Sequence, residues 1–213
     1  SNIGVDMEMM DGMINFTADY YIKKTSDMLY AAPIPLVAGT AAPIQNIANA
    51  ENKGLELAAN YRNNKNAFKY SVGANISFVK SLITGLGRGG DPVASGYVQF
   101  ANANASQTDV GQPIASFYGY VTDGIFQTPA EVEAHAFQNE DTAPGDIRFK
   151  DLDGDGKIDV NDRTYIGNPT PDYTFGVNGS LEYAGFELGI TFQGAQGNEI
   201  FNYVRYWTDF NTF

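Results

Sequence analysis

The residues best suited to do chemistry lie in one acidic stretch, residues 151–162, which reads DLDGDGKIDVND. Oxygen-bearing side chains occupy positions 1, 3, 5, 9 and 12 of this stretch, and Gly156 occupies position 6. Calcium-binding loops of the EF-hand type place their oxygen ligands at this spacing and use a glycine for the sharp turn. The pattern therefore predicts a calcium site formed by Asp151, Asp153, Asp155, Lys157 through its backbone carbonyl, Asp159 and Asp162.

The segment before this loop, residues 146–150, reads as a strand, so we expect the loop without the paired helices of an EF-hand. Asp162 is shorter than the glutamate usual at position 12, which limits its reach to the ion. We expect a structural role for Ca²⁺, because carboxylates that fill the coordination sphere leave little room for an activated water. The alternative is an acidic surface turn that binds nothing.

Composition excludes several classes of function. The 213 residues include no Cys, which excludes disulfides and thiolate metal sites. The formal net charge of −12 argues against a nucleic-acid partner, because phosphate binding requires a basic face. The single histidine, His135, has no catalytic partners at a recognisable spacing, so we do not expect an enzyme.

Strict alternation of apolar and polar residues predicts the strands that carry the loop. Residues 3–10 alternate weakly, and the clear runs are 14–23, 55–62, 68–78, 173–183 and 186–193. The runs of eleven residues exceed the usual globular strand and match the ~9–11 residues with which a tilted strand crosses a bilayer.

The connections between these strands alternate strictly in length. Short turns are expected at Asp11-Gly12, Asn63–Asn66 and Ala184-Gly185, and long loops at 25–50, at 85–170 and beyond 194. Outer-membrane barrels have this asymmetry, with short periplasmic turns and long extracellular loops. Tyr61, Phe68, Tyr183 and Phe186 lie beside the short turns on the apolar faces, as interfacial aromatic residues do.

We therefore predict an all-β fold, an antiparallel up-and-down transmembrane β-barrel segment with long extracellular loops. One short helix is expected at residues 129–137, together with the EF-hand-like calcium loop. About six spanning strands cannot close around a lumen, so residues 1–213 are expected to form part of a larger barrel. Within it, 85–170 is the long extracellular loop region that contains the calcium loop 151–162. A soluble antiparallel sandwich is the alternative.

Several stretches resemble SusC/RagA-type TonB-dependent transporters. They are Asn15–Lys24, Glu51–Glu56, Gly111–Tyr120, Asp123–Gln127 and the block from Gly145 through the calcium loop to Pro171. The resemblance implies an outer-membrane barrel that imports oligosaccharides or peptides. It also implies a SusD-type surface lipoprotein as partner, and energy supplied by the TonB complex through an N-terminal region that this sequence lacks.

Three aromatic residues of the long loop region are candidate substrate contacts. Tyr118, Tyr120 and Phe126 either stack on a glycan or peptide substrate or pack the loop region. The functional alternative to an importer is a soluble or surface-displayed, calcium-stabilised β-rich binding module.

Overall fold

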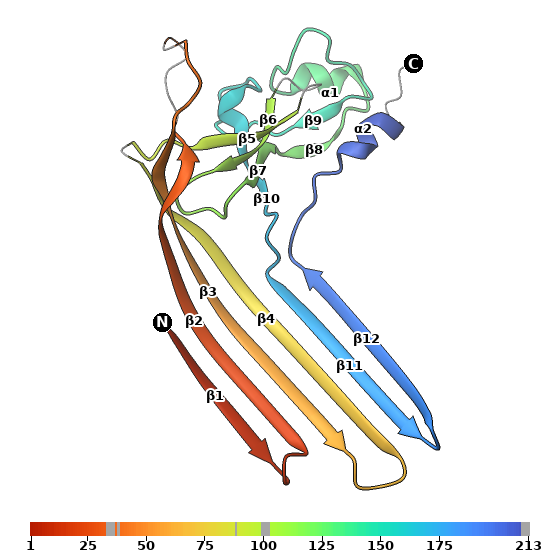
Figure 1. Cartoon of the computed structure of the whole chain (residues 1–213). Helices are drawn as coiled ribbons and strands as arrows, with labels where there is room; N and C mark the ends of the chain where they lie inside the picture. The colour runs from red at the N-terminus through yellow and green to blue at the C-terminus, as the bar shows by residue number, and fades with distance from the viewer. Residues whose placement is uncertain (33–36, 38, 88, 99–102, 210–213) are drawn as a thin grey trace. The chain divides into compact units, whose positions relative to one another are not determined.

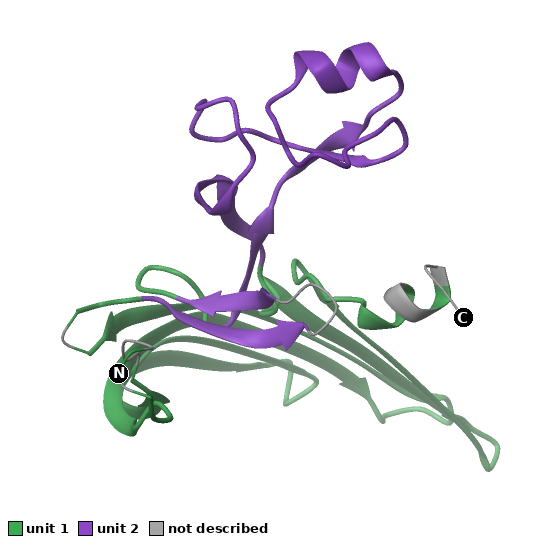
Figure 2. Cartoon of the chain, turned by 90° about the horizontal axis from the view of Figure 1, so that it is seen from above, with its two compact units in different colours: residues 1–91, 109–114, 168–213 green, residues 92–108, 115–167 purple. Residues whose placement is uncertain are grey.

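The computed structural model describes residues 1–32, 37, 39–87, 89–98 and 103–209. They form two compact units, coloured separately in Figure 2. Unit 1 comprises Ser1–Asp91, Asp109–Ile114 and Asn168–Phe213, and unit 2 comprises Pro92–Thr108 and Ala115–Gly167. Neither α-helix among the described residues has the length and apolar character of a membrane-crossing helix.

Unit 1 is built on a six-stranded antiparallel sheet in the order β1-β2-β3-β4-β11-β12 (Figure 1). Its strands are β1 (Asn2–Met9), β2 (Ile14–Ala31), β3 (Ile44–Asn63), β4 (Lys69–Leu86), β11 (Tyr173–Tyr183) and β12 (Phe186–Gln196). Sequence neighbours are sheet neighbours throughout, except that the chain leaves the sheet between β4 and β11. The six predicted strands and their up-and-down order are confirmed.

The short connections lie where they were predicted, but two of them differ in length. The turn between β3 and β4 covers residues 64–68 rather than Asn63–Asn66. Met9 and Ile14 form the last pair of the first hairpin, so its loop covers residues 10–13 rather than Asp11-Gly12 alone. Met10 and Asp11 both have positive φ, 55° and 56°, and the Met13 amide donates to the Met10 carbonyl at 3.2 Å. The alternation of apolar and polar residues therefore locates the end of a strand less precisely than the backbone geometry of the turn does.

The β11–β12 turn offers a test of local backbone strain. Ala184 (φ 50°) and Gly185 (φ 86°) connect the Tyr183–Phe186 pair, the two-residue geometry that favours Asn-Gly. An alanine is disfavoured in this region by about 1 kcal/mol. We expect Ala184→Asn to raise the unfolding free energy of the full-length barrel by ~0.5–1 kcal/mol. Gly185→Ala should lower it by about 1 kcal/mol. Both changes are measured by urea titration in liposomes. A lower urea midpoint for Ala184→Asn would contradict the assignment of strain to this residue.

The strand register sorts the side chains onto two faces of the sheet, because residues directly opposite each other in an antiparallel pair lie on the same face. One continuous cross-strand row contains Met7, Phe16, Ala59, Ala74, Val177 and Phe192. The adjacent row, one position along each strand, contains Asp6, Thr17, Ala58, Asn75, Gly176 and Gln193. We call these the apolar face and the polar face of the sheet.

Aromatic residues bound the apolar face at both ends. Near the short turns the Phe68 and Tyr183 rings lie 6.2 Å apart, and Phe186 is 82% exposed. At the opposite end the register aligns a second row, which we call the upper aromatic row: Ile3, Tyr20, Leu55, Phe78 and Tyr173. The eight residue steps from Tyr70 to Phe78 span ~26 Å along the strand, or ~20 Å across a bilayer at the usual tilt of ~40°. The two aromatic ends therefore have the spacing of a membrane-embedded band.

The predicted loop at 25–50 is wrong in extent, because β2 continues to Ala31 and β3 starts at Ile44. The β2–β3 pairing is irregular between Thr25 and Leu29, and Asp27 has φ 56°. This irregularity breaks the alternation on which the sequence interpretation depended. The extension is stabilised by a small buried cluster of Ala48, Ala50, Ile83 and Leu86, against which Met28 and Tyr30 pack.

Unit 2 contains short elements from the interval between β4 and β11. Its four-stranded sheet has the order β10-β7-β6-β5, with β5 (Val93–Val98), β6 (Ala103–Thr108), β7 (Ser116–Tyr120) and β10 (Arg163–Gly167). A second, two-stranded sheet pairs β8 (Thr122–Ile125) with β9 (Ile147–Phe149). The predicted helix is α1 (Pro129–Ala134), where the Thr128 hydroxyl accepts a hydrogen bond from the Glu131 amide at 3.3 Å. The prediction of a single helix is wrong, because α2 (Tyr203–Asp209) forms in unit 1.

Candidate functional site

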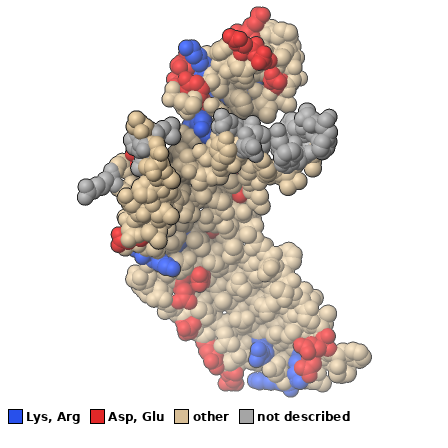
Figure 3. Space-filling model, turned by 45° about the horizontal axis from the view of Figure 1, so that its top comes forward, with Lys and Arg blue, Asp and Glu red and all other residues tan. Residues whose placement is uncertain are grey.

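The predicted metal ligands at the start of the acidic loop converge in the structure. Carboxylate oxygens of Asp151, Asp153 and Asp155 all lie within 4.8 Å of one another. Ca²⁺ binds oxygens at about 2.3–2.6 Å, so two oxygens on opposite sides of one ion are about 5 Å apart. The three carboxylates therefore fit around a single calcium ion. In the space-filling view, Asp and Glu side chains gather at the top of the molecule (Figure 3).

Backbone amides hold these carboxylates in place. Asp151 accepts from the Gly154 amide at 2.7 Å through Oδ1 and from the Gly156 amide at 3.0 Å through Oδ2. Asp153 Oδ1 accepts from the Asp155 amide at 3.1 Å, and Asp155 Oδ1 accepts from the Lys157 amide at 2.8 Å. Gly154 and Gly156 have φ of 77° and 84°, in the region that glycine tolerates best. The loop coils tightly because these two positions take glycine.

The last two predicted ligands have a different arrangement. Asp159 and Asp162 form a reciprocal capping box around the 3₁₀ helix η3 (Val160–Asp162). Asp162 is only 1% exposed, and its carboxylate accepts from the Leu152 amide at 2.7 Å and from the Asp159 amide at 2.8 Å. Asp162 therefore links the beginning of the loop to its end. Both of its oxygens already serve this link.

The electrostatics of the loop differ between its two ends. Hydrogen bonds from the Asp159 and Leu152 amides hold the pKa of Asp162 below its ordinary value. For Asp153 the Asp155 amide acts in the same direction, but desolvation and the carboxylates of Asp155, Asp162 and Asp151 outweigh it and raise the pKa. Desolvation and mutual repulsion both contribute to the raised pKa of Asp153, and a bound cation would relieve the repulsion.

The loop is also tied to the segment that follows α1. The Phe137 amide donates to the Gly156 carbonyl at 2.9 Å, and the Ile158 amide donates to the Phe137 carbonyl at 2.8 Å. Next to it, Gln138 accepts from the Phe149 amide at 2.7 Å and donates to the Ile147 carbonyl at 3.1 Å. The order of the acidic loop is therefore coupled to the path of the chain after α1 and to strand β9.

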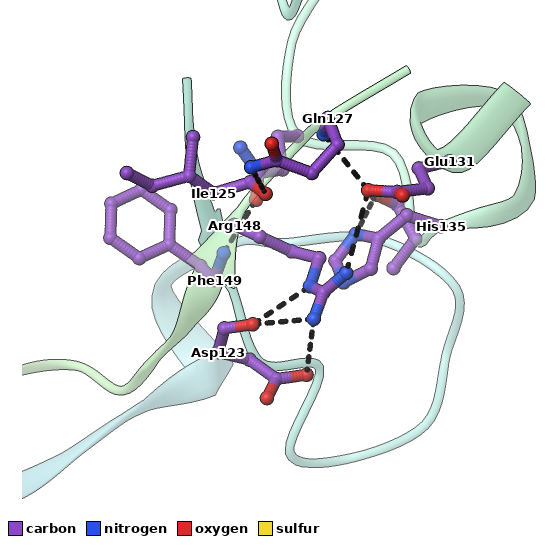
Figure 4. A network of polar contacts seen from close by, with 9 residues as sticks. Asp123, Ile125, Gln127, Glu131, His135, Arg148 and Phe149 are labelled. Carbon is purple, nitrogen blue, oxygen red and sulfur yellow. Dashed lines mark hydrogen bonds and ion pairs between the residues drawn. The ribbon is translucent and has the colours of Figure 1, made fainter. Parts of the chain in front are cut away.

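Arg148 forms a network that the sequence interpretation did not anticipate (Figure 4). Its guanidinium donates through Nε to the Asp123 carbonyl at 2.9 Å and lies 3.9 Å from the Glu131 carboxylate. Glu131 Oε2 in turn accepts from the Gln127 amide at 2.9 Å. Arg148 thus joins β8, β9 and the first turn of α1. The one sequence signal was a cation placed between the apolar residues Ile147 and Phe149.

The three predicted substrate contacts have different surroundings. Phe126 is 1% exposed, and its ring meets the His135 ring edge-on at a centroid distance of 5.2 Å. Tyr118 is half-buried, with its ring 5.1 Å from that of Tyr165, and Tyr120 is half-buried with its ring 5.2 Å from that of Phe149. All three side chains pack against other aromatic rings of unit 2. Their role in substrate binding stays a prediction.

A single arginine organises the two tyrosines. The Arg163 guanidinium carbon lies 5.0 Å from the centre of the Tyr118 ring and 5.9 Å from that of Tyr120. The same guanidinium donates to the Asn104 carbonyl at 3.0 Å and the Tyr118 carbonyl at 3.3 Å. A guanidinium that lies over aromatic faces and also donates hydrogen bonds stabilises the packing of the strands it contacts. Arg163 connects β6, β7 and β10.

Comparison with known proteins gives consistent results. Residues 2–213 match the family described as TonB dependent receptor-like, beta-barrel. The chain is 38% identical over 205 residues to TonB-dependent receptor P3 of Formosa agariphila, covering 95% of this chain and 20% of that protein. It is 26% identical over 202 residues to TonB-dependent receptor SusC of Bacteroides thetaiotaomicron, covering 94% and 19% respectively.

Solved structures support the fold. The RagAB peptide importer in its "closed-closed" state matches with a TM-score of 0.73 and 22% identity, over 97% of this chain and 22% of that chain. A further structure of the RagAB peptide transporter matches with a TM-score of 0.75 and 21% identity, over 98% and 22%. The chain thus spans about a fifth of the length of the proteins that it matches.

Proposed function

Because this chain belongs to the TonB-dependent receptor β-barrel family, we propose that it forms part of the wall and outer loops of a nutrient importer. The family consists of outer-membrane β-barrel proteins, and the six-stranded sheet is a portion of such a barrel of the SusC/RagA type. The observation that carries the proposal is the apolar face, which continues across all six strands and carries aromatic residues near both ends. Exposed apolar surface on this scale is stable in lipid and is a liability in water.

The proposed cargo is an oligosaccharide or a peptide, taken up with energy from the TonB complex. Support comes from the similarity to SusC and from the RagAB structures, whose names describe a peptide importer. The polar face suits a water-filled or plugged lumen, because its rows combine amides, hydroxyls and a few carboxylates. The alternative of a soluble binding module does not account for the apolar face.

A surface lipoprotein of the SusD type is the proposed partner, and unit 2 is the proposed place of contact. The chain leaves the sheet at the end of β4 and returns at the start of β11, the end opposite the short turns. Strand parity therefore places the interval 85–170 outside the cell if the short turns are periplasmic. This orientation is open to a direct test.

Calcium is the proposed structural cofactor of unit 2, and Asp151, Asp153 and Asp155 are its proposed side-chain ligands. The Lys157 carbonyl and Asp159 are the remaining candidates, while Asp162 holds the two ends of the loop together. The bound ion supplies positive charge that offsets the repulsion among the carboxylates. It would hold the chain from β9 to β10 in one path, and with it the segment at Phe137.

The orientation can be tested by labelling single cysteines in cells, since this chain contains none of its own. In a full-length protein whose other cysteines have been replaced, Glu133→Cys places a thiol on the exposed surface of α1. Lys65→Cys places one in the exposed turn between β3 and β4. We expect a membrane-impermeant maleimide to label position 133 in intact cells and position 65 only after the outer membrane is permeabilised.

The labelling is repeated in cells that lack the neighbouring lipoprotein, so that protection by a partner is separated from burial. Labelling of position 133 that increases without the lipoprotein supports contact between it and unit 2. Labelling of position 65 but not 133 in intact cells would show that the proposed topology is inverted.

A further inference from the structure

The register places three lysines together on the apolar face, where charged side chains are not expected. The next row on this face lies two residues beyond the upper aromatic row. In it, Lys53 of β3 stands directly opposite Ile22 of β2 on one side and Lys80 of β4 on the other. Two residues further, Lys24 stands opposite Glu51. Gly54 confirms the assignment of faces, because a Cβ at this position would meet the ring of Tyr21, which lies on the polar face with it.

The pairing of Lys53 with Lys80 is unfavourable by itself. Like charges directly opposite each other in an antiparallel pair are destabilising. Glu51 lies 2.6 Å from the Lys53 ammonium and 3.5 Å from that of Lys24, so one carboxylate serves two of the three cations. Among the described residues no carboxylate forms an ion pair with Lys80. The cluster therefore keeps a surplus of two positive charges in a chain whose formal net charge is −12.

The depth of this cluster indicates what neutralises it. Aromatic rings at the ends of a membrane-embedded band lie at the level of the lipid headgroups. Two residues along a strand correspond to ~6–7 Å, less after tilt, so the lysines of β3 and β4 lie at or just beyond that level. The side chains of Lys24 and Lys53 are 77% and 46% exposed on this face. Ammonium groups at this depth face the phosphate layer of the leaflet.

We propose that Lys53 and Lys80, assisted by Lys24, bind the phosphate group of an anionic lipid headgroup in the outer leaflet. A phosphate between Lys53 and Lys80 removes their repulsion and accepts hydrogen bonds from both ammonium groups. Glu51 fixes the position of the Lys53 ammonium through their ion pair. The proposal goes beyond import and depends only on the apolar face meeting lipid and on the long loops facing outward.

The test uses the full-length barrel, purified in a mild nonionic detergent, and native mass spectrometry. Phosphatidylglycerol serves as the phosphate-bearing probe and phosphatidylcholine as the zwitterionic reference. A basic residue near a membrane surface strengthens binding of anionic lipid roughly fivefold. We therefore expect the double substitution Lys53→Gln with Lys80→Gln to weaken retention of phosphatidylglycerol by roughly 25-fold and to leave phosphatidylcholine unchanged.

Lys23→Gln provides a matched control, because Lys23 is next to Lys24 on the same strand but lies on the polar face. It should retain the probe lipid as well as the wild type does. Thermal unfolding gives an independent readout, because each protein is compared with itself in the presence and absence of the lipid. Phosphatidylglycerol should raise the unfolding temperature of the wild type and not that of the double variant.

Three results would overturn the proposal. Equal retention of phosphatidylglycerol by the wild type and the double variant would remove the lysines from the binding site. A loss of the same size for Lys23→Gln would show a general effect of charge. Protection from unfolding by inorganic phosphate equal to that by the lipid would show an anion site that does not select lipid. None of these results would alter the orientation found by cysteine labelling.

Discussion

Arginine at position 177 is expected to destabilise the folded full-length barrel by about 2–4 kcal/mol, whereas arginine at position 188 should cost only about 0–1 kcal/mol. Val177 belongs to the middle row of the apolar face, halfway between the two aromatic ends. Leu188 pairs with Leu181, in the apolar row next to the Tyr183–Phe186 pair at the short turn. A charge is most costly at the bilayer midplane and least costly near the headgroups, so the two sites should differ although both face lipid.

The same experiment includes a control on the opposite face. Thr191 lies on the polar face, in the row that also contains Asn60 and Asn178. We expect Thr191→Arg to change the unfolding free energy by less than about 0.5 kcal/mol, as at other surface positions. Val72→Arg, in the row next to the middle one, should fall between Val177→Arg and Leu188→Arg.

The measurement is urea unfolding of each variant in liposomes, with the heat-dependent mobility shift of folded barrels on gels as a second readout. A loss of 2–4 kcal/mol corresponds to roughly a 30- to 1000-fold change in the ratio of folded to unfolded protein. Equal losses at Val177 and Thr191 would show that the two faces are not lipid and lumen. Equal losses at Val177 and Leu188 would show that the band lies at another height on the sheet.

Sequence alternation predicted the strands wherever one face is uniformly apolar and the pairing is regular. The eleven-residue strands β11 and β12 illustrate this. They stay in register along their whole length, from the Tyr173–Gln196 pair to the Tyr183–Phe186 pair. Alternation failed where the backbone departs from the regular pleat. At Asp27, with φ 56°, the irregular pairing moved later residues out of phase, and the upper parts of β2 and β3 read as loop.

Features that depend on three or more strands were not accessible from the sequence. Tyr20, Phe78 and Tyr173 are distant in sequence, and they form one aromatic row only after the register is known. The Lys53–Lys80 pairing involves only β3 and β4, but both lysines lie beyond the predicted ends of these strands. The acidic loop was predictable because its ligands fall within twelve residues, so local spacing alone determines which oxygens can converge.

The amide network around Asp162 shows the limit of ligand spacing as evidence. Position 12 of the loop carries an acidic residue, as the pattern requires, yet its side chain is only 1% exposed and both of its oxygens accept backbone hydrogen bonds. A twelve-residue pattern specifies which side chains carry oxygen and does not specify which of them stay available to an ion. For this reason the substitutions that test calcium binding belong at Asp153 and Asp155, whose side chains are exposed.

Removing calcium, or replacing both of these aspartates by alanine, is expected to make residues 145–170 of the full-length protein about 10- to 100-fold more sensitive to protease. Sites of this kind bind Ca²⁺ at ~10⁻⁴–10⁻³ M, so 10 mM calcium stabilises the closed loop by about 1.4–2.7 kcal/mol over the open one. Cleavage follows the population of the open form when opening is fast. The readout is the cleavage rate in calcium and in chelator.

Two further variants separate calcium binding from loop geometry. Asp153→Asn with Asp155→Asn keeps the side-chain oxygens that accept from the Asp155 and Lys157 amides but removes two negative charges. With chelator this variant should resist protease better than the wild type, because the carboxylate repulsion is reduced, and it should gain less protection from calcium. Asp141→Ala, an exposed carboxylate outside the loop, should behave as the wild type does. If the chelator and the alanine double substitution leave the cleavage rate unchanged, calcium does not order this loop, and the hydrogen bonds of Asp151 and Asp162 are sufficient to hold it.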